Sequence, residues 1–260
     1  MARDPQFDML YILVSSHDHY VVTHGIRFQD FLQSLAVPLE NLLLLKHAYT
    51  GGEFHYHTKL DYVTKDQIAE LAKKHVDEFG DFCWIDFEDV FNLDTLDGPE
   101  LAELLYLGHM KHHLSPPFFQ KLNNRYVYLT ESDGWYNKTY FRNWSDFYDI
   151  LGTVLADRAT EIKMDRWFAG FRKKKVYPRV DRSILHQLSP YMTEGIVLSF
   201  SAVNQLKGQL SIPFWVVGDF VDMEEMREHF QQQLDSPPAG RLFFDKKIRD
   251  WGIAFTGRSS

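Results

Sequence analysis

Short apolar runs alternate with helical patterns along the first half of this chain, and this alternation restricts the fold more than any other feature. The runs at 7–15, 42–45 and 82–85 are apolar nearly throughout, which is typical of strands buried on both faces. The segments 26–35 and 64–79 carry apolar residues at helical spacing. We therefore expect an α/β protein with a mixed sheet flanked by helices.

Two helices have clear signals at their N-termini. Thr64 and Gln67 form a capping box at the start of the second helical segment, because each side chain can bond a backbone N–H that has no partner in the first turn. Pro99, two residues after Asp97, fits the start of a helix over 99–113. These signals predict where the helices begin.

The strongest turn signal is Asp133-Gly134, which lies between two β-rich runs at 125–130 and 135–141 and predicts a hairpin. Further strands or helices are expected at 19–23, 145–158, 181–188, 195–200, 212–217, 222–234 and 242–244. An α+β arrangement of the C-terminal half remains open as an alternative.

The domain organisation follows from the absence of any linker-like stretch. Gly and Pro occur often in the 260 residues but never form a linker, so we expect one domain over residues 1–260. The least cohesive stretch, 160–182, is the candidate boundary between two lobes.

Cysteine usage, hydropathy and charge exclude several classes of protein. The single Cys83 cannot form an intramolecular disulfide, which fits a reducing cytoplasm. No run of about 18 apolar residues occurs, so we expect no association with a membrane. The formal net charge of -8 argues against a protein that binds duplex DNA. These features indicate a soluble, cytoplasmic protein.

Histidine is unusually frequent, with 12 residues, and one group of candidates depends on topology. Ligands in open α/β sheets bind beyond the carboxyl ends of the strands. His17 and His19 follow the first apolar run, His47 follows the second and Asp86 follows the third. If these strands are parallel neighbours, the four side chains form a site for a divalent Zn, Mn or Fe ion.

Two other histidine groups are alternative metal sites. His55 and His57 share a face if their segment is extended. His109 and His113 have the i, i+4 spacing by which a helix presents two imidazoles to one metal ion, with His112 nearby on the apolar stripe. In each group the simpler interpretation is a packed or solvated histidine.

Charge is distributed unevenly, and aromatic residues make up 15% of the chain. The stretch 81–100 is acidic and has no Lys or Arg, whereas a basic run lies among aromatic residues. The candidate binding residues of that run are Arg172, Lys173, Lys174 and Lys175. A solvated turn is the preferred interpretation of this run, but the opposed charges also fit a protein partner or self-association.

Two functions remain. The preferred hypothesis is a non-catalytic protein that binds a partner through aromatic and charged surface patches. The alternative is a metal-dependent, hydrolase-like enzyme that uses one of the histidine groups. The sequence contains no phosphate-binding loop, no dinucleotide-binding fingerprint and no serine-hydrolase elbow. Their absence weakens the hypotheses of a nucleotide hydrolase, a dinucleotide-binding enzyme and a serine hydrolase.

Overall fold

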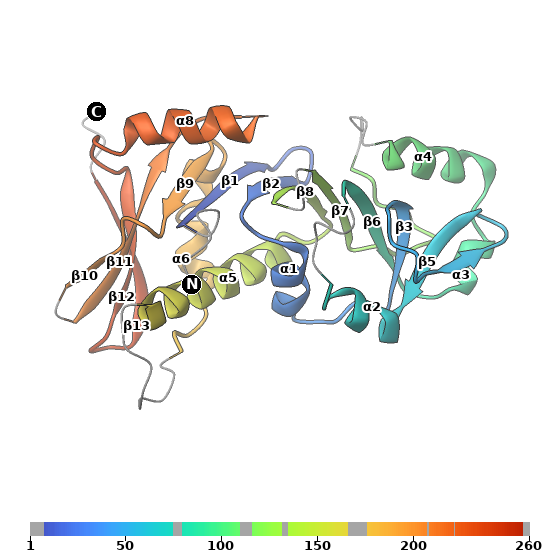
Figure 1. Ribbon diagram of the computed structural model, residues 1–260, viewed down its shortest axis with the longest axis horizontal. Coiled ribbons are helices and arrows are strands. Elements are labelled where there is room, and N and C mark those ends of the chain that lie inside the picture. Colours follow the sequence, from blue (N-terminus) through green and yellow to red (C-terminus); the bar gives the residue numbers. More distant parts are fainter. Residues whose placement is uncertain are drawn as a thin grey trace. The chain divides into compact units, whose positions relative to one another are not determined.

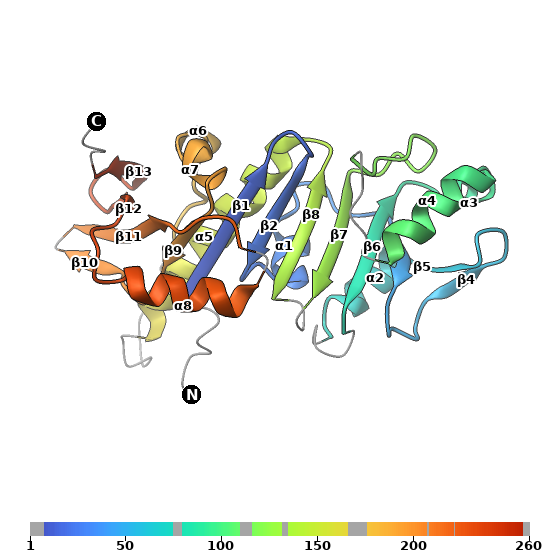
Figure 2. The same ribbon diagram turned by 90° about the horizontal axis from the view of Figure 1, so that it is seen from above.

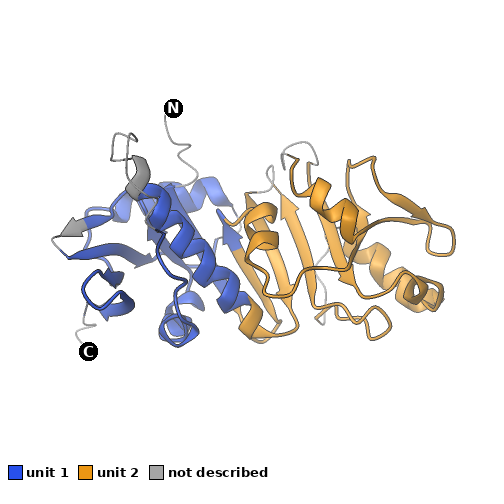
Figure 3. Ribbon diagram, turned by 90° about the horizontal axis from the view of Figure 1, so that it is seen from below, with its two compact units in different colours: residues 1–14, 23–25, 147–260 blue, residues 15–22, 26–146 orange. Residues whose placement is uncertain are grey.

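The structure is a computed structural model, shown in Figure 1. It describes residues 8–74, 80–109, 116–131, 135–165, 176–206, 208–220 and 222–256. The chain divides into two compact units (Figure 3). Unit 1 contains residues 1–14, 23–25 and 147–260, and unit 2 contains residues 15–22 and 26–146. The stretch 160–182, which was the candidate boundary, lies inside unit 1; a single domain over the whole chain remains a prediction.

The sheet of unit 2 is antiparallel and ends at a short strand. Its order is β8 (Tyr136–Phe141), β7 (Tyr126–Glu131), β6 (Phe82–Phe87), β3 (Asn41–Lys46), β5 (Leu60–Thr64) and β4 (Glu53–His55). Each of these neighbours pairs antiparallel, and Figure 2 shows the strands side by side. The predicted hairpin is confirmed as the pair β7–β8, whereas the Asp133-Gly134 turn lies outside the described residues.

Helices cover parts of both faces of this sheet. They are α1 (Phe28–Ser34), α2 (Lys65–Leu71), α3 (Phe91–Asp94) and α4 (Gly98–Gly108). Phe28 of α1 packs edge-on against Trp84, with ring centroids 4.6 Å apart. Ile85, the next residue of β6, belongs to the core cluster that contains Leu104 of α4. Because consecutive strand residues point to opposite faces, α1 and α4 cover opposite sides of the sheet.

The strands of unit 1 also pair antiparallel with their neighbours. The order is β13 (Asp250–Phe255), β12 (Gly240–Asp245), β11 (Gln209–Val216), β9 (Ile196–Ser199) and β1 (Met9–Ser15), and β10 (Asn204–Leu206) also pairs with β11. The strand β2 (Tyr20–His24) follows β1 along the chain. Its end, Thr23–His24, belongs to unit 1.

The helices of unit 1 also lie on both faces of their strands. They are α5 (Trp144–Asp165), α6 (Arg182–His186), α7 (Ser189–Met192) and α8 (Met223–Gln233). Phe230 of α8 packs on Trp215, whereas Tyr191 of α7 packs on the adjacent Phe214. Neighbouring residues of β11 point to opposite faces, so α8 and α7 cover opposite sides.

The expected fold class is confirmed at the level of a mixed α/β chain dominated by antiparallel strands. The capping box of Thr64 and Gln67 is present at the start of α2, but this helix ends at Leu71 and is shorter than the predicted 64–79. Residues 75–79 lie outside the described part of the chain. The sequence patterns did not predict β13, β10 or α3.

The N-terminus of α8 allows a direct test of these helix assignments. The side chain of Asp222 accepts hydrogen bonds from the backbone N–H groups of Glu224 at 2.7 Å and Glu225 at 3.2 Å. Asp222→Ala leaves these two donors to water, so we expect a loss of about 1 kcal/mol in the free energy of unfolding, measured by urea denaturation. The nearby exposed Asp235→Ala is the control, and an equal loss in both variants would contradict the assignment.

Candidate functional site

The hairpin formed by β4 and β5, residues 53–64, is fixed to unit 2 by polar contacts on one side. The Tyr62 hydroxyl donates to Glu53 at 2.8 Å. His55 lies with its Nε2 atom 3.4 Å from the Asp94 carboxylate of α3. His57 places Nε2 2.9 Å from the carbonyl oxygen of Leu96. The first contact lies within the hairpin, and the two histidine contacts join the hairpin to the segment that contains α3.

Aromatic side chains of the same hairpin are exposed to solvent. Phe54 is 50% exposed and Tyr56 is 80% exposed. Their ring centroids lie 5.5 Å apart in an edge-to-face arrangement, and the Lys59 ammonium lies 5.9 Å from the centre of the Tyr56 ring. We call residues 53–64 the aromatic hairpin. The hairpin presents two large rings on a backbone that is already ordered. This order reduces the entropic cost of binding a partner through the rings.

The histidines of the first predicted metal site have separate partners in the structure. His17 is exposed and lies 2.9 Å from the carboxylate of its neighbour Asp18. His19 stacks on Trp144, with ring centroids 5.8 Å apart. His47 places Nδ1 2.7 Å from the Tyr49 carbonyl oxygen, and its Nε2 atom lies 3.2 Å from Asp61.

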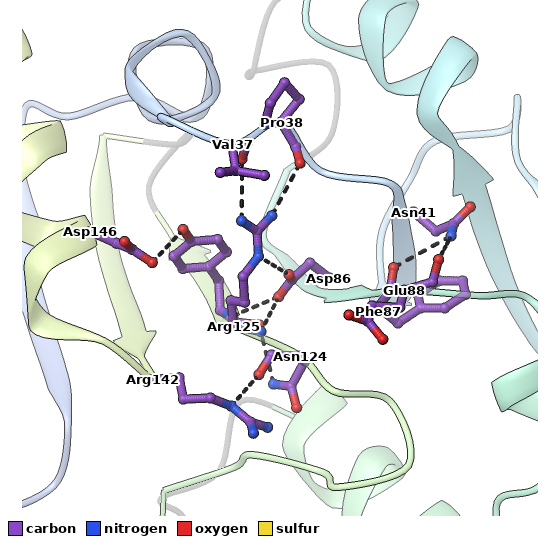
Figure 4. A network of polar contacts seen from close by, with 11 residues as sticks. Val37, Pro38, Asn41, Asp86, Phe87, Glu88, Asn124, Arg125, Arg142 and Asp146 are labelled. Carbon is purple, nitrogen blue, oxygen red and sulfur yellow. Dashed lines mark hydrogen bonds and ion pairs between the residues drawn. The ribbon is translucent and has the colours of Figure 1, made fainter.

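Asp86, the fourth predicted ligand, is buried and holds a turn of the backbone together (Figure 4). Its carboxylate accepts hydrogen bonds from the backbone N–H groups of Arg125 at 2.9 Å and Tyr126 at 2.6 Å, and from the Arg125 Nε atom at 3.2 Å. Arg125 also donates to the carbonyl oxygens of Val37 and Pro38. Burial is the largest influence on the carboxyl group and raises its pKa to about 6, although these contacts oppose the shift.

The strand arrangement on which this site depended is wrong. β3 and β6 pair antiparallel, with Leu42 opposite Asp86 and Lys46 opposite Cys83. His47, which follows Lys46, therefore lies at the other end of the strand pair from Asp86. The reason is that β5 and β6 flank β3 on its two sides and both run antiparallel to it, so the crossover through α2 connects β5 to β6 rather than β3 to β6.

The two alternative histidine groups have different outcomes. The first makes other contacts through its ring nitrogens, and the second lies partly outside the residues that the structure describes. His55 and His57 bond within the aromatic hairpin and to the α3 segment, as given above. His109 is the C-cap of α4, and His112 and His113 lie outside the described residues. In the part of the chain that the structure describes, no group of three or more His, Cys, Asp or Glu side chains could hold a metal ion.

The single cysteine and the basic run complete the comparison with the sequence analysis. Cys83 is fully buried in β6, and burial raises the pKa of its thiol, which disfavours the reactive thiolate. Arg172, Lys173, Lys174 and Lys175 lie outside the residues that the structure describes.

The sequence patterns did not single out the exposed rings of the aromatic hairpin. Two other aromatic residues, Trp135 and Tyr136, lie beside the predicted Asp133-Gly134 turn. Both of these side chains are half-buried, and the Arg27 guanidinium lies 5.6 Å from the centre of the Trp135 ring. Strand alternation accounts for Phe54, which precedes the buried His55 in β4. Tyr56 and His57 lie in the turn between β4 and β5, and both are exposed, so alternation along a strand does not predict the position of the Tyr56 ring.

Comparisons with known proteins add no family to this description. No protein-family model matches the chain, and neither a curated protein nor a solved structure matches it. Among the described residues, the helices are too short or too polar to span a bilayer.

Proposed function

We propose that this protein is a non-catalytic, partner-binding protein and that the aromatic hairpin is part of its binding surface. The observation that carries the proposal is the exposure of Phe54 and Tyr56 on a segment whose other side is fixed by His55 and His57. Tyrosine and phenylalanine contribute large contact areas at small entropic cost, and they are enriched at protein interfaces.

Charge near the hairpin indicates the chemistry of the partner. The α3 segment, joined to the hairpin through Asp94 and His55, carries Phe91 with 78% of its side chain exposed. Glu88 and Asp89 precede this ring and are also exposed. A protein segment with basic and apolar side chains complements such a surface.

The chain itself contains a sequence of this kind. Residues 166–175 read Arg-Trp-Phe-Ala-Gly-Phe-Arg-Lys-Lys-Lys, which combines five basic side chains with three aromatic ones. We therefore favour self-association, in which Arg172, Lys173, Lys174 and Lys175 of a second copy contribute to binding. The single buried Cys83 supports a cytoplasmic location, and the net charge of -8 supports a protein partner rather than duplex DNA.

Substitution of the two exposed rings tests the proposal. We expect the double variant Phe54→Ser/Tyr56→Ser to bind a synthetic peptide of residues 166–175 at least about tenfold more weakly than the unchanged protein, measured by fluorescence anisotropy. Sedimentation equilibrium should show a matching loss of self-association. Both side chains are exposed, so the free energy of unfolding should change by less than about 1 kcal/mol.

A matched control removes an equally exposed apolar side chain elsewhere. Ile248 is 73% exposed and lies in unit 1, so Ile248→Ser should leave peptide binding unchanged. A peptide with Glu in place of every Arg and Lys should bind poorly. The proposal fails if the double variant binds the basic peptide as the unchanged protein does, or if the acidic peptide binds equally well.

A further inference from the structure

The end of β2 places a buried histidine beside two arginines of unit 1. His24 is 2% exposed, and its Nε2 atom lies 2.8 Å from the Nη2 atom of Arg227 on α8. Because a guanidinium group can only donate, Nε2 must be the acceptor, which requires that nitrogen to be unprotonated. The contact therefore exists only while the His24 ring is neutral.

The second arginine approaches from another helix. Arg158 of α5 is buried and donates to the carbonyl oxygens of Met9, at 3.2 Å, and of Gly25, the residue that follows His24. Burial is the main cause that lowers the pKa of His24 to about 4, and the charges of Arg227 and then Arg158 lower it further, against a hydrogen bond with its own backbone. A proton on this ring would be buried among positive charges.

The helix that carries Arg227 has two buried apolar side chains. Met226 and Phe230 are the buried side chains of α8, and Phe230 packs on Trp215 of β11. The remainder of the helix is strongly polar, with exposed Glu224, Glu225 and Glu228. Protonation of His24 removes its contact with Arg227 and adds repulsion between the charged ring and the two guanidinium groups. Both effects weaken the attachment of α8 to the rest of unit 1.

We propose that protonation of His24 releases α8 from the strands of unit 1, so that this helix is an acid-sensitive element of the protein. The sign follows from linkage. A histidine with a lowered pKa in the folded state contributes stability that is present above its unfolded pKa of 6.5 and is lost as the pH falls towards 4. The release of α8 therefore occurs in the acidic range.

Hydrogen exchange followed by mass spectrometry tests this proposal. After correction for the intrinsic effect of pH, we expect the protection of the α8 amides to fall about 100-fold between pH 7 and pH 4, while the β9 and β11 amides keep their protection. In His24→Gln, which carries an acceptor that does not titrate, the protection of α8 should become nearly independent of pH. The control His229→Gln, on α8 itself, should behave like the unchanged protein.

A second variant keeps the test decisive if His24→Gln does not fold. Arg227→Gln retains a donor for His24 but removes one positive charge, so the acid-dependent loss of protection should become smaller. The proposal is overturned if His24→Gln or Arg227→Gln keeps the full acid response. It is also overturned if α8 and the strands lose protection together in the unchanged protein, because that result indicates unfolding of the whole unit.

Discussion

Replacement of Asp86 by alanine is expected to lower the free energy of unfolding by about 3 kcal/mol at pH 7, measured by urea denaturation. The buried carboxylate accepts from two backbone N–H groups and from the side chain of Arg125. Alanine leaves these donors without their acceptor in a place where water does not readily replace it. The exposed Asp81, which precedes β6, provides the control, since Asp81→Ala should cost less than about 1 kcal/mol.

The loss in the Asp86→Ala variant should also depend on pH. Burial raises the pKa of Asp86 from 3.8 to about 6, so the proton-linked part of its contribution to stability is greatest below pH 3.8 and is lost as the pH rises through 6. The deficit of the variant should therefore be about 2 kcal/mol larger at pH 4 than at pH 7. A deficit below about 1 kcal/mol at both pH values would show that this carboxyl group does not hold the turn.

Gly195→Ala should have a comparable effect in unit 1. Gly195 has a φ of +81°, and a Cβ atom added there would lie 2.0 Å from the carbonyl oxygen of Gly218. That oxygen accepts a hydrogen bond from the Tyr11 hydroxyl at 3.0 Å, so it cannot move without loss of another contact. We expect a loss of about 3–4 kcal/mol in the free energy of unfolding, from backbone strain and steric overlap together.

Gly208 separates these two causes. Its φ is +95°, but a Cβ atom there would meet no atom within 4 Å. Gly208→Ala should therefore cost only the backbone strain, about 1–2 kcal/mol. Thermal unfolding followed by circular dichroism compares the two variants. Equal losses would show that the close approach of Gly195 and Gly218 does not occur in solution.

Elements with complete local signals could be predicted from the sequence. The capping box of Thr64 and Gln67 and the Asp133-Gly134 signal predicted the start of α2 and the pairing of β7 with β8. These signals act within a few residues and need no information from the rest of the chain. By contrast, the predictions missed β13, although Trp251, Ile253 and Phe255 alternate with smaller residues along it. Its six residues form a strand by pairing with β12.

The candidate site was harder to predict because contacts between distant residues determine it. Asp86 comes directly after the predicted apolar run 82–85, as a metal ligand would, but the structure places it inside β6, and its role depends on the distant Arg125. The direction of β3 relative to β6 was equally hidden, because a short apolar run does not show which way it runs. The positions of individual histidines could be predicted from the pattern, but their partners could not.

The pairing of Met9 with Ser199 has a consequence for synthesis of the chain. As the polypeptide leaves the ribosome, the continuous stretch 26–146 is complete long before β9 exists, so unit 2 has the opportunity to fold first. Until β9 has been synthesised, the apolar strand β1 lacks this pairing partner. A chain that stops between residues 147 and 195 would thus contain the whole of unit 2 but expose the unpaired apolar edge of β1 to chaperones and proteases.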